Sequence, residues 1–294
     1  MDQLYIPAGA SAEGAFDTVI DPGVRDGWVH TGLRIARLGA GDSASFTATG
    51  VEVMALPISG GARITVGGET VTLRPRADVF AAAPDVLYAP EGSTLEISSE
   101  EGARIALALA RTTGEGAHPV TLIPAEDVPV EVRGAGAMTR IVRNFGTVGV
   151  FDDCESLIAC EVITPGGNWS SYPAHKHDES TATESELEEI YYYEIQDAPD
   201  GGPGFGYHRT SSTDEQRPID ELHEVHPGDV VLVPHGWHGP CAAAPGHAMY
   251  YLNVMAGPDP VRAWNITDHP EQTWVRGTWD GLDPDPRAAT GDVR

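Results

Sequence analysis

The sequence is poor in cysteine, in basic residues and in long apolar runs. Its three cysteines, Cys154, Cys160 and Cys241, form no C-x-x-C pair, which argues against a disulfide framework and a thiolate zinc site and fits a reducing compartment. No apolar stretch approaches the roughly 20 residues needed to cross a bilayer, and the N-terminus has no basic start followed by an apolar segment. We therefore expect a soluble, unprocessed, cytoplasmic protein.

Positive charge is the scarcest property of the chain. Lysine and arginine total 18 against 44 aspartates and glutamates, a formal charge of −26 at pH 7. The resulting field repels phosphate backbones and anionic membrane surfaces, so neither nucleic acid nor a membrane is an expected partner. An anionic substrate would also be repelled, and a site for one would need local cations. No pattern in the sequence sets the oligomeric state, so a homo-oligomer stays open.

Glycine and proline, in contrast, are abundant, with 34 and 23 residues spread along the 294-residue chain. This punctuation is typical of a turn-rich all-β protein, and an apolar content of 41% argues against disorder. Strands are predicted at 33–38, 51–57, 62–66, 69–73, 93–97 and 104–110, and again at 139–144, 157–164, 189–195, 204–210, 229–234 and 248–255. The restart after a polar stretch at 120–132 predicts two β-domains, 1–125 and 126–294.

The two halves share a pattern in which a strand ends in Pro-x-Gly. Residues 85–92 (DVLYAPEG) resemble residues 228–236 (GDVVLVPHG). After this turn the second half offers His238, whereas the first half offers Ser93, Thr94 and Leu95. The repeat predicts that only the second half binds a metal.

The segment 169–178 (WSSYPAHKHD) contains an H-x-H pair. Side chains two apart in an extended strand point to the same face, so His175 and His177 can share one ion. In the later segment 187–194, Glu189, Tyr191 and Tyr193 alternate with bulky residues, which places a carboxylate and two phenols on one face of the strand. Glu188 faces the other way and is expected to be solvated. A buried carboxylate needs a partner, and a metal is the usual one.

The Pro-x-Gly turn can return the chain beside this pair and deliver His238, whereas His235 lies inside the turn and is expected to face solvent. Three neutral imidazoles and one carboxylate suit one divalent ion: Zn, Mn, Fe, Ni or Co. The ligand chemistry does not choose among these metals. The predicted ligands are His175, His177, Glu189 and His238.

These residues resemble the two cupin motifs, which implies a bicupin made of two double-stranded β-helix (jelly-roll) barrels. Two spacings depart from the usual pattern, since the spacer 178–188 is long and His238 follows the Pro-x-Gly turn one residue early. The polar insertion at 179–186 is predicted to be a mobile loop over the barrel mouth.

A narrower resemblance accounts for the long spacer. The segments that carry it are 166–178 (GGNWSSYPAHKHD), 187–193, 204–207, 228–236 and 250–258. Through these segments the chain is similar to the 5-deoxy-glucuronate isomerase family of myo-inositol catabolism. This resemblance implies an aldose–ketose isomerase that converts 5-deoxy-glucuronate to 2-deoxy-5-keto-gluconate.

Such an isomerase needs a group that moves a proton and cations for the substrate carboxylate. The inward-facing candidates for proton transfer are Glu161, Tyr193 and Tyr251, with His208 less favoured. The alternative for Glu161 is a surface charge at the end of a strand, and the alternative for Tyr193 is a tyrosine that packs in the core. Glu161 is expected to have a raised pKa. The candidate substrate cations are Lys176, Arg140, Arg143 and Arg209, each of which is otherwise a surface charge.

Two other functions fit the same ligands. One is a metal-dependent cupin oxygenase, which would consume oxygen, and the other is a non-catalytic cupin that binds a sugar acid. Neither explains the Trp-Ser-Ser-Tyr-Pro segment that precedes the H-x-H pair.

Overall fold

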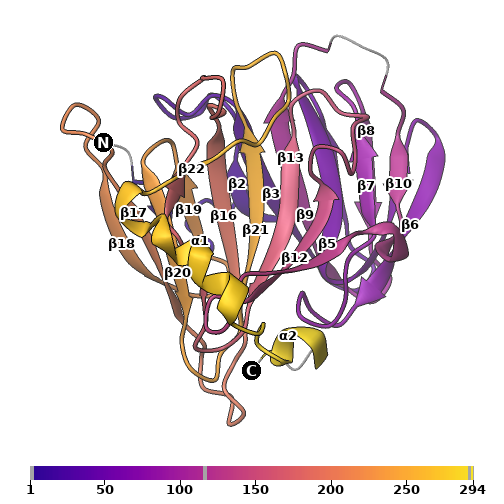
Figure 1. The fold of residues 1–294 in the computed structure, drawn as a ribbon. Helices are drawn as coiled ribbons and strands as arrows, with labels where there is room; N and C mark the ends of the chain where they lie inside the picture. Colours follow the sequence, from indigo (N-terminus) through magenta and orange to yellow (C-terminus); the bar gives the residue numbers. More distant parts are fainter. Residues whose placement is uncertain (1–2, 115–117, 291–292, 294) are drawn as a thin grey trace.

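A computed structural model of the chain describes residues 3–114, 118–290 and 293. Two groups of strands lie side by side in Figure 1, the N-terminal group in purple and the C-terminal group in pink to yellow. The all-β fold expected from the glycine and proline pattern is confirmed. No helix in the described part of the chain is long and apolar enough to cross a membrane.

The N-terminal group is one nine-stranded antiparallel sheet with neighbours in the order β10-β7-β5-β9-β3-β2, to which β4, β6 and β8 are joined off this path. Its strands are β2 (Phe16–Ile20), β3 (Thr31–Leu38), β4 (Ser43–Thr47), β5 (Val51–Val66), β6 (Glu69–Arg76), β7 (Val86–Ala89), β8 (Thr94–Ser98), β9 (Ala103–Arg111) and β10 (Thr121–Ile123). The predicted strands 51–57 and 62–66 are one long strand, β5, whose register against β6 shifts between Gly60 and Ala62.

The C-terminal group consists of two sheets, of seven and six strands. The first has the order β1-β19-β16-β21-β13-β12-β11 and contains β1 (Tyr5–Ile6), β11 (Val130–Arg133), β12 (Arg140–Gly146), β13 (Ile158–Thr164), β16 (Glu188–Ile195), β19 (Val230–Val233) and β21 (Met249–Ala256). The second contains β14 (Trp169–Ser170), β15 (His175–Lys176), β17 (Gly206–Ser211), β18 (Asp220–Val225), β20 (Trp237–Ala243) and β22 (Thr267–Asp268).

Short helical elements connect and follow the strands. They are the 3-10 turn η1 (Ala125–Asp127), then η2 (Pro270–Gln272), α1 (Trp274–Thr278), η3 (Trp279–Gly281) and α2 (Arg287–Thr290). Except for β1, which pairs with β19, the strands before η1 lie in the N-terminal sheet and those after it lie in the C-terminal sheets. The strand pairing therefore divides close to residue 125, and the N-terminal strand crosses that division.

The core has three main layers because the central sheets are buried on both faces. One cluster lies inside the N-terminal group and another inside the C-terminal group. The largest lies between the two groups. On β16, Tyr191 and Tyr193 face the interior of the C-terminal group, while Ile190 and Tyr192 face the other group. This is the period-two alternation predicted for the strand.

Two buried carboxylates tie the groups together in a reciprocal way. Glu188, at the start of β16, accepts hydrogen bonds from the backbone N–H groups of residues 29–31 at 2.6–3.1 Å. Glu52, near the start of β5, accepts hydrogen bonds from the backbone N–H groups of residues 155–157 at 2.6–2.9 Å. The expectation that Glu188 is solvated is therefore wrong, because the face that it occupies is covered by the other group of strands.

Replacement of Glu188 by alanine is expected to lower the free energy of unfolding by about 3 kcal/mol, because buried N–H groups lose their acceptor at about 1–3 kcal/mol each. Denaturant unfolding measures this change. Glu186→Ala, which removes an exposed carboxylate two residues earlier, is the control and should change stability by less than about 0.5 kcal/mol. Equal effects of the two substitutions would contradict this role of Glu188.

Candidate metal centre and substrate cavity

Three histidine side chains converge inside the C-terminal group. His175 on β15 lies directly opposite His238 on β20 in the antiparallel register, and His177 follows β15 immediately. One ligand atom from each of the three lies within 4.8 Å of the others. His177 and His238 are each only 1% exposed. His235, the competing residue of the turn, is not part of this cluster.

Backbone carbonyls orient all three rings in the same way. Nδ1 of His175 lies 3.3 Å from the carbonyl oxygen of Pro173, Nδ1 of His177 lies 3.2 Å from that of Leu187, and Nδ1 of His238 lies 3.1 Å from that of Gly236. A carbonyl oxygen only accepts hydrogen bonds, so each Nδ1 carries the proton and donates it. Nε2 is therefore the nitrogen that each ring has left to bind a metal ion, the arrangement found around metal-bound histidines.

Glu189 on β16 completes the cluster. Its Oε2 lies 3.1 Å from Nε2 of His177 and 3.2 Å from Nε2 of His238. Nε2 of His238 is buried and has no hydrogen-bond partner in the described part of the chain. At these distances the lone pairs of two nitrogens and a carboxylate oxygen repel one another unless a proton or a metal cation lies between them, and against the effect of burial the contact with Glu189 raises the pKa of His177. The donor set therefore fits a divalent metal ion.

The protonation of the cluster follows from burial and these contacts. Burial lowers the pKa of His175 well below its ordinary value, and the neighbouring His238 and His177 lower it further. Burial alone would raise the pKa of Glu189, but the contacts with His177 and His238 outweigh it and hold this pKa well below its usual range. Glu189 is therefore ionised and His175 is neutral, as metal ligands must be.

A cavity of about 230 Å³ opens next to the cluster. Its walls include His175 and Glu189, the phenols of Tyr191 and Tyr251, and the guanidinium groups of Arg133, Arg140 and Arg276. A metal-type donor set, hydroxyl groups and cations thus meet in one space. This is the combination that the strongly acidic chain needs to bind an anion.

Arg140 is the cation in this cavity that lacks a counter-ion. Arg133 pairs with Glu131 and Arg276 with Asp268, whereas the described residues place no carboxylate within ion-pair distance of Arg140. Burial lowers the pKa of Arg140 to about 10, and the nearby Arg133 and Arg276 contribute to the decrease. The group is still protonated at neutral pH, so Arg140 presents an uncompensated positive charge to the cavity.

The Trp-Ser-Ser-Tyr-Pro segment brings a hydroxyl group into the site. Ser171 has the unusual positive φ of 45°, and its Oγ lies 3.2 Å from the hydroxyl of Tyr251 and 3.4 Å from that of Tyr191. A Cβ atom at Gly239 would lie 1.9 Å from the carbonyl oxygen of Ser171, so only glycine allows β20 and the segment after β14 to approach this closely. Burial raises the pKa of both tyrosines, which keeps the phenols protonated.

Tyr193 lies beneath the cavity and does not line it. Its hydroxyl group lies 2.6 Å from Nδ1 of His208, whose Nε2 lies 2.9 Å from Oγ1 of Thr210. Burial lowers the pKa of His208 to about 3, so this histidine is neutral. Tyr193 and His208 therefore form a buried hydrogen-bonded chain with Thr210, away from the space that a substrate can reach.

Glu161 and Arg143 lie between the two groups of strands, which corrects their interpretation as proton-transfer and substrate residues. Oε1 of Glu161 accepts hydrogen bonds from Arg76 at 2.6 Å and from the hydroxyl of Tyr250 at 2.9 Å, and Oε2 accepts one from Arg143 at 3.2 Å. Burial alone would raise the pKa of Glu161, but Arg76 and Arg143 outweigh it and lower this pKa. The predicted raised pKa is therefore wrong.

Lys176 and Arg209 also point away from the cavity. The ammonium group of Lys176 lies 2.7 Å from Asp178 and 2.6 Å from Glu184. Arg209 pairs with Asp220 at 2.6 Å on the β17–β18 hairpin. Both charges are used in ion pairs, so of the four predicted substrate cations only Arg140 lines the cavity.

The insertion at 179–186, which was predicted to be a mobile loop over the barrel mouth, has a buried end. Glu184 and Ser185 are buried, and Glu184 accepts hydrogen bonds from Lys176 and from the backbone N–H of Asp178. Asp178 in turn accepts a hydrogen bond at 3.0 Å from the backbone N–H of Gly236, in the turn before His238. The end of the insertion is thus anchored to the segments that carry the histidines.

Several cavity residues were missed because they carry no motif. Arg133 lies opposite Arg140 in the β11–β12 register, and Asn253 lies opposite Tyr191 in the β16–β21 register. Strand pairing brings these residues to the site. The sequence held a signal only for Asn253, which lies two positions after Tyr251 on β21 and therefore shares its inward face. Arg276 lies on α1, far along the chain, and its position depends on the tertiary fold.

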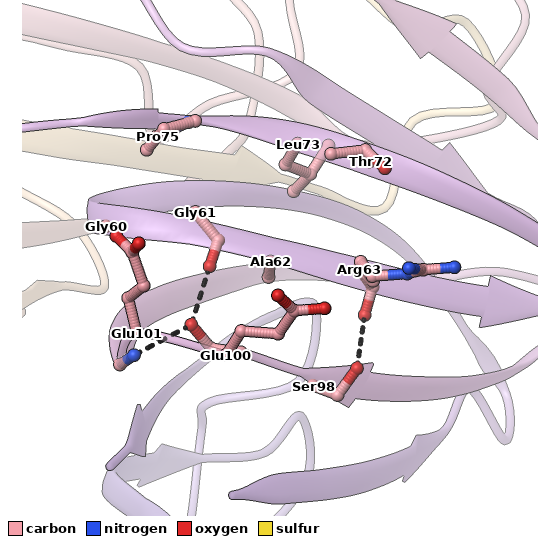
Figure 2. Close-up of a pocket in the computed structure, with 12 residues that line it drawn as sticks. Gly60, Gly61, Ala62, Arg63, Thr72, Leu73, Pro75, Ser98, Glu100 and Glu101 are labelled. Atoms are coloured by element: carbon pink, nitrogen blue, oxygen red, sulfur yellow. Dashed lines mark hydrogen bonds between the residues drawn. The ribbon is translucent and has the colours of Figure 1, made fainter. Parts of the chain in front are cut away.

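A larger cavity of about 380 Å³ lies in the N-terminal group (Figure 2). Two of its hydroxyl groups are bonded to backbone carbonyls of the same cavity: that of Ser98 donates to Arg63, and that of Ser99 donates to Gly61. The interior of this group is apolar, and the residue that follows Glu52 is Val53, whereas the residue that follows Glu188 is the carboxylate Glu189. The metal-type donors, hydroxyl groups and cations are found together in the smaller cavity, next to the three histidines.

Comparison with known proteins identifies the family of the chain. The KduI/IolB family matches residues 4–275. This chain belongs to the KduI/IolB family. It is 38% identical over 279 residues to the 5-deoxy-glucuronate isomerase of Geobacillus kaustophilus HTA426, covering 94% of this chain and 96% of that protein. It is 36% identical over 252 residues to that of Bacillus subtilis 168, covering 83% and 86%.

Solved structures resemble the whole KduI/IolB chain as well. An IolB-like protein of Salmonella typhimurium LT2 superposes with a TM-score of 0.81 and 30% identity, covering 93% of this chain and 99% of that one. Oxalate decarboxylase of Lactobacillus farciminis superposes with a TM-score of 0.63 and 12% identity, covering 99% and 96%, and shows similarity of fold alone. The cupin fold expected from the motifs is confirmed.

Proposed function

We propose that this chain is a metal-dependent aldose–ketose isomerase that converts 5-deoxy-glucuronate to 2-deoxy-5-keto-gluconate. The observation that carries the proposal is one cavity that joins a His/Glu donor set to an uncompensated guanidinium group. The substrate has a carbonyl and a hydroxyl at one end and a carboxylate at the other, so the two halves of the cavity match its two ends. Membership of the KduI/IolB family supports the same reaction.

His175, His177, Glu189 and His238 would hold the metal in the C-terminal barrel of a bicupin. A bound divalent ion, Zn, Mn, Fe, Ni or Co, supplies Lewis-acid stabilisation of the negative charge that develops on the substrate oxygens. The neutral imidazoles leave the charge of the ion largely in place.

The protonated phenol of Tyr251 is placed to hold or move a proton at a substrate oxygen. It lines the cavity and is linked through Ser171 to the hydroxyl of Tyr191. Since aldose–ketose isomerisation shifts a proton between neighbouring carbons and between their oxygens, a hydroxyl relay beside the ligands serves the second transfer. Asn253 and the arginines bind and orient the rest of the substrate.

Replacement of Tyr251 by phenylalanine is expected to reduce kcat about a hundredfold with little change in KM, because proton transfer by one positioned group contributes about 10²–10⁴-fold. Steady-state kinetics measure the effect. Tyr193→Phe is the matched control, since Tyr193 lies opposite Tyr251 on the neighbouring strand β16, on the same sheet face, but does not line the cavity. Equal losses in both variants would remove Tyr251 from the reaction.

Turnover of 5-deoxy-glucuronate in deuterated water tests the function itself. The isomerase should incorporate solvent deuterium at the carbon that receives the proton and consume no oxygen. Oxygen consumption with substrate would identify an oxygenase instead. Binding of metal and sugar acid without deuterium incorporation would identify a binding protein.

A further inference from the structure

The segment that follows β21 returns across the metal-bearing sheet. β22 pairs with β15, where Asp268 lies directly opposite His175. The backbone N–H of His269 donates to the carbonyl of Ala174 at 2.8 Å, and that of Ala174 donates to the side chain of Gln272 at 2.7 Å. α1 then lies across the strands of the C-terminal group (Figure 1). The segment 264–279 is therefore fixed to the strand that carries the H-x-H pair.

This segment forms one wall of the cavity. Trp264, Ile266 and Arg276 line it. The guanidinium groups of Arg140 and Arg276 each lie 5.3 Å from the ring centroid of Trp279, so one aromatic ring holds two like charges. Asp268 already balances the charge of Arg276, and an anion beside Arg140 would remove the remaining repulsion between the two guanidinium groups.

The three arginines of the cavity and their ion-pair partners carry a net charge of one positive unit. Arg133 is balanced by Glu131 and Arg276 by Asp268, whereas Arg140 has no ion-pair partner among the residues that the structure describes. One carboxylate on the ligand would neutralise the set. A dianion, such as a phosphate ester, would leave the wall negatively charged.

Two buried hydrogen-bond donors of the cavity also favour an oxygen-rich ligand. Nδ2 of Asn253, which is 3% exposed, and Nε1 of Trp264 are buried without a hydrogen-bond partner. Both are donors, and buried donors without acceptors are rare in folded proteins. A ligand rich in oxygen acceptors would satisfy both groups.

We infer that segment 264–279 is part of the substrate site, in which Arg276 and Arg140 bind the carboxylate of an open-chain hydroxy acid while Trp264 and Asn253 donate hydrogen bonds to its other oxygens. The inference rests on the proposed function for the identity of the substrate. The carboxylate lies at the Trp279 end, which leaves the carbonyl end for the histidines. Reading the sequence around the metal motifs alone does not reveal this wall.

Calorimetric titration of the metal-loaded protein with D-gluconate and with D-glucitol tests the inference, because the two differ only by the carboxylate and neither has a carbonyl to isomerise. Arg140→Met and Arg276→Met are expected to weaken gluconate binding about 10–100-fold, since a hydrogen-bonded charge contributes about 1.5–3 kcal/mol. Binding of glucitol and metal content should stay unchanged. Arg37→Met, which removes an exposed charge from β3, should bind both as the unmodified protein does.

Gluconate affinity in Arg276→Met equal to that in Arg37→Met would overturn the inference. Arg276→Lys serves as the second variant if the methionine variant does not fold; it keeps the charge but not the planar contact with Trp279, and should weaken gluconate binding at least about threefold. An unchanged affinity in that variant would also count against the inference. Absence of turnover of 5-deoxy-glucuronate by the unmodified protein would refute the proposed function while leaving the carboxylate site standing.

Discussion

His238→Ala is expected to lose bound metal and to reduce turnover about a thousandfold or more. The substitution removes one of three converging imidazoles and leaves Glu189 facing an empty space beside His177. Lewis-acid stabilisation is worth several kcal/mol, and each 1.4 kcal/mol corresponds to about tenfold in rate. Metal analysis of the purified variant, with turnover of 5-deoxy-glucuronate, measures both effects.

His235→Ala is the matched control for this substitution. His235 belongs to the same turn, three positions earlier, but lies outside the histidine cluster. It should therefore keep its metal and most of its activity. Full activity in a metal-free His238→Ala protein would refute the metal-dependent mechanism, and equal metal loss in both variants would show that the turn, rather than the imidazole, matters.

The convergence of the three histidines with Glu189 was predictable from sequence because its determinants are local. Alternation of side chains along β16 places Glu189, Tyr191 and Tyr193 on one face whatever the rest of the fold does. The Pro-x-Gly turn likewise sets the direction in which the chain reaches His238. About half of the strands in the described part of the chain were predicted for the same reason, since glycine and proline mark their ends, whereas β20, which carries His238, was not.

The other face of the same strands was read incorrectly. Glu188 and Glu161 were expected at solvent or near substrate, yet each is buried against the other group of strands. Local alternation states which residues share a face, and it does not state what covers that face. Of the predicted cations only Arg140 lines the cavity, and Arg133 and Arg276 were missed because they reach it only through strand register and through the return of the C-terminal segment.

Glu161→Ala is expected to lower the free energy of unfolding by about 3–5 kcal/mol, because two buried guanidinium groups, Arg76 and Arg143, lose their shared counter-ion. This is a large fraction of the about 5–15 kcal/mol that stabilises a typical protein. Denaturant unfolding gives the change. The turnover per folded, metal-loaded molecule should change little, since Glu161 does not line the cavity.

Replacing Arg76, Glu161 and Arg143 together distinguishes the cost of unpaired buried charges from the cost of lost packing. The triple variant Arg76→Met, Glu161→Leu, Arg143→Met leaves no unpaired charge, and replacement of buried ion networks by apolar residues is often neutral or stabilising by about 1–4 kcal/mol. It should therefore be more stable than Glu161→Ala alone. If Glu161→Ala instead keeps full stability and loses turnover, the carboxylate acts in the reaction and the two groups of strands are held together without it.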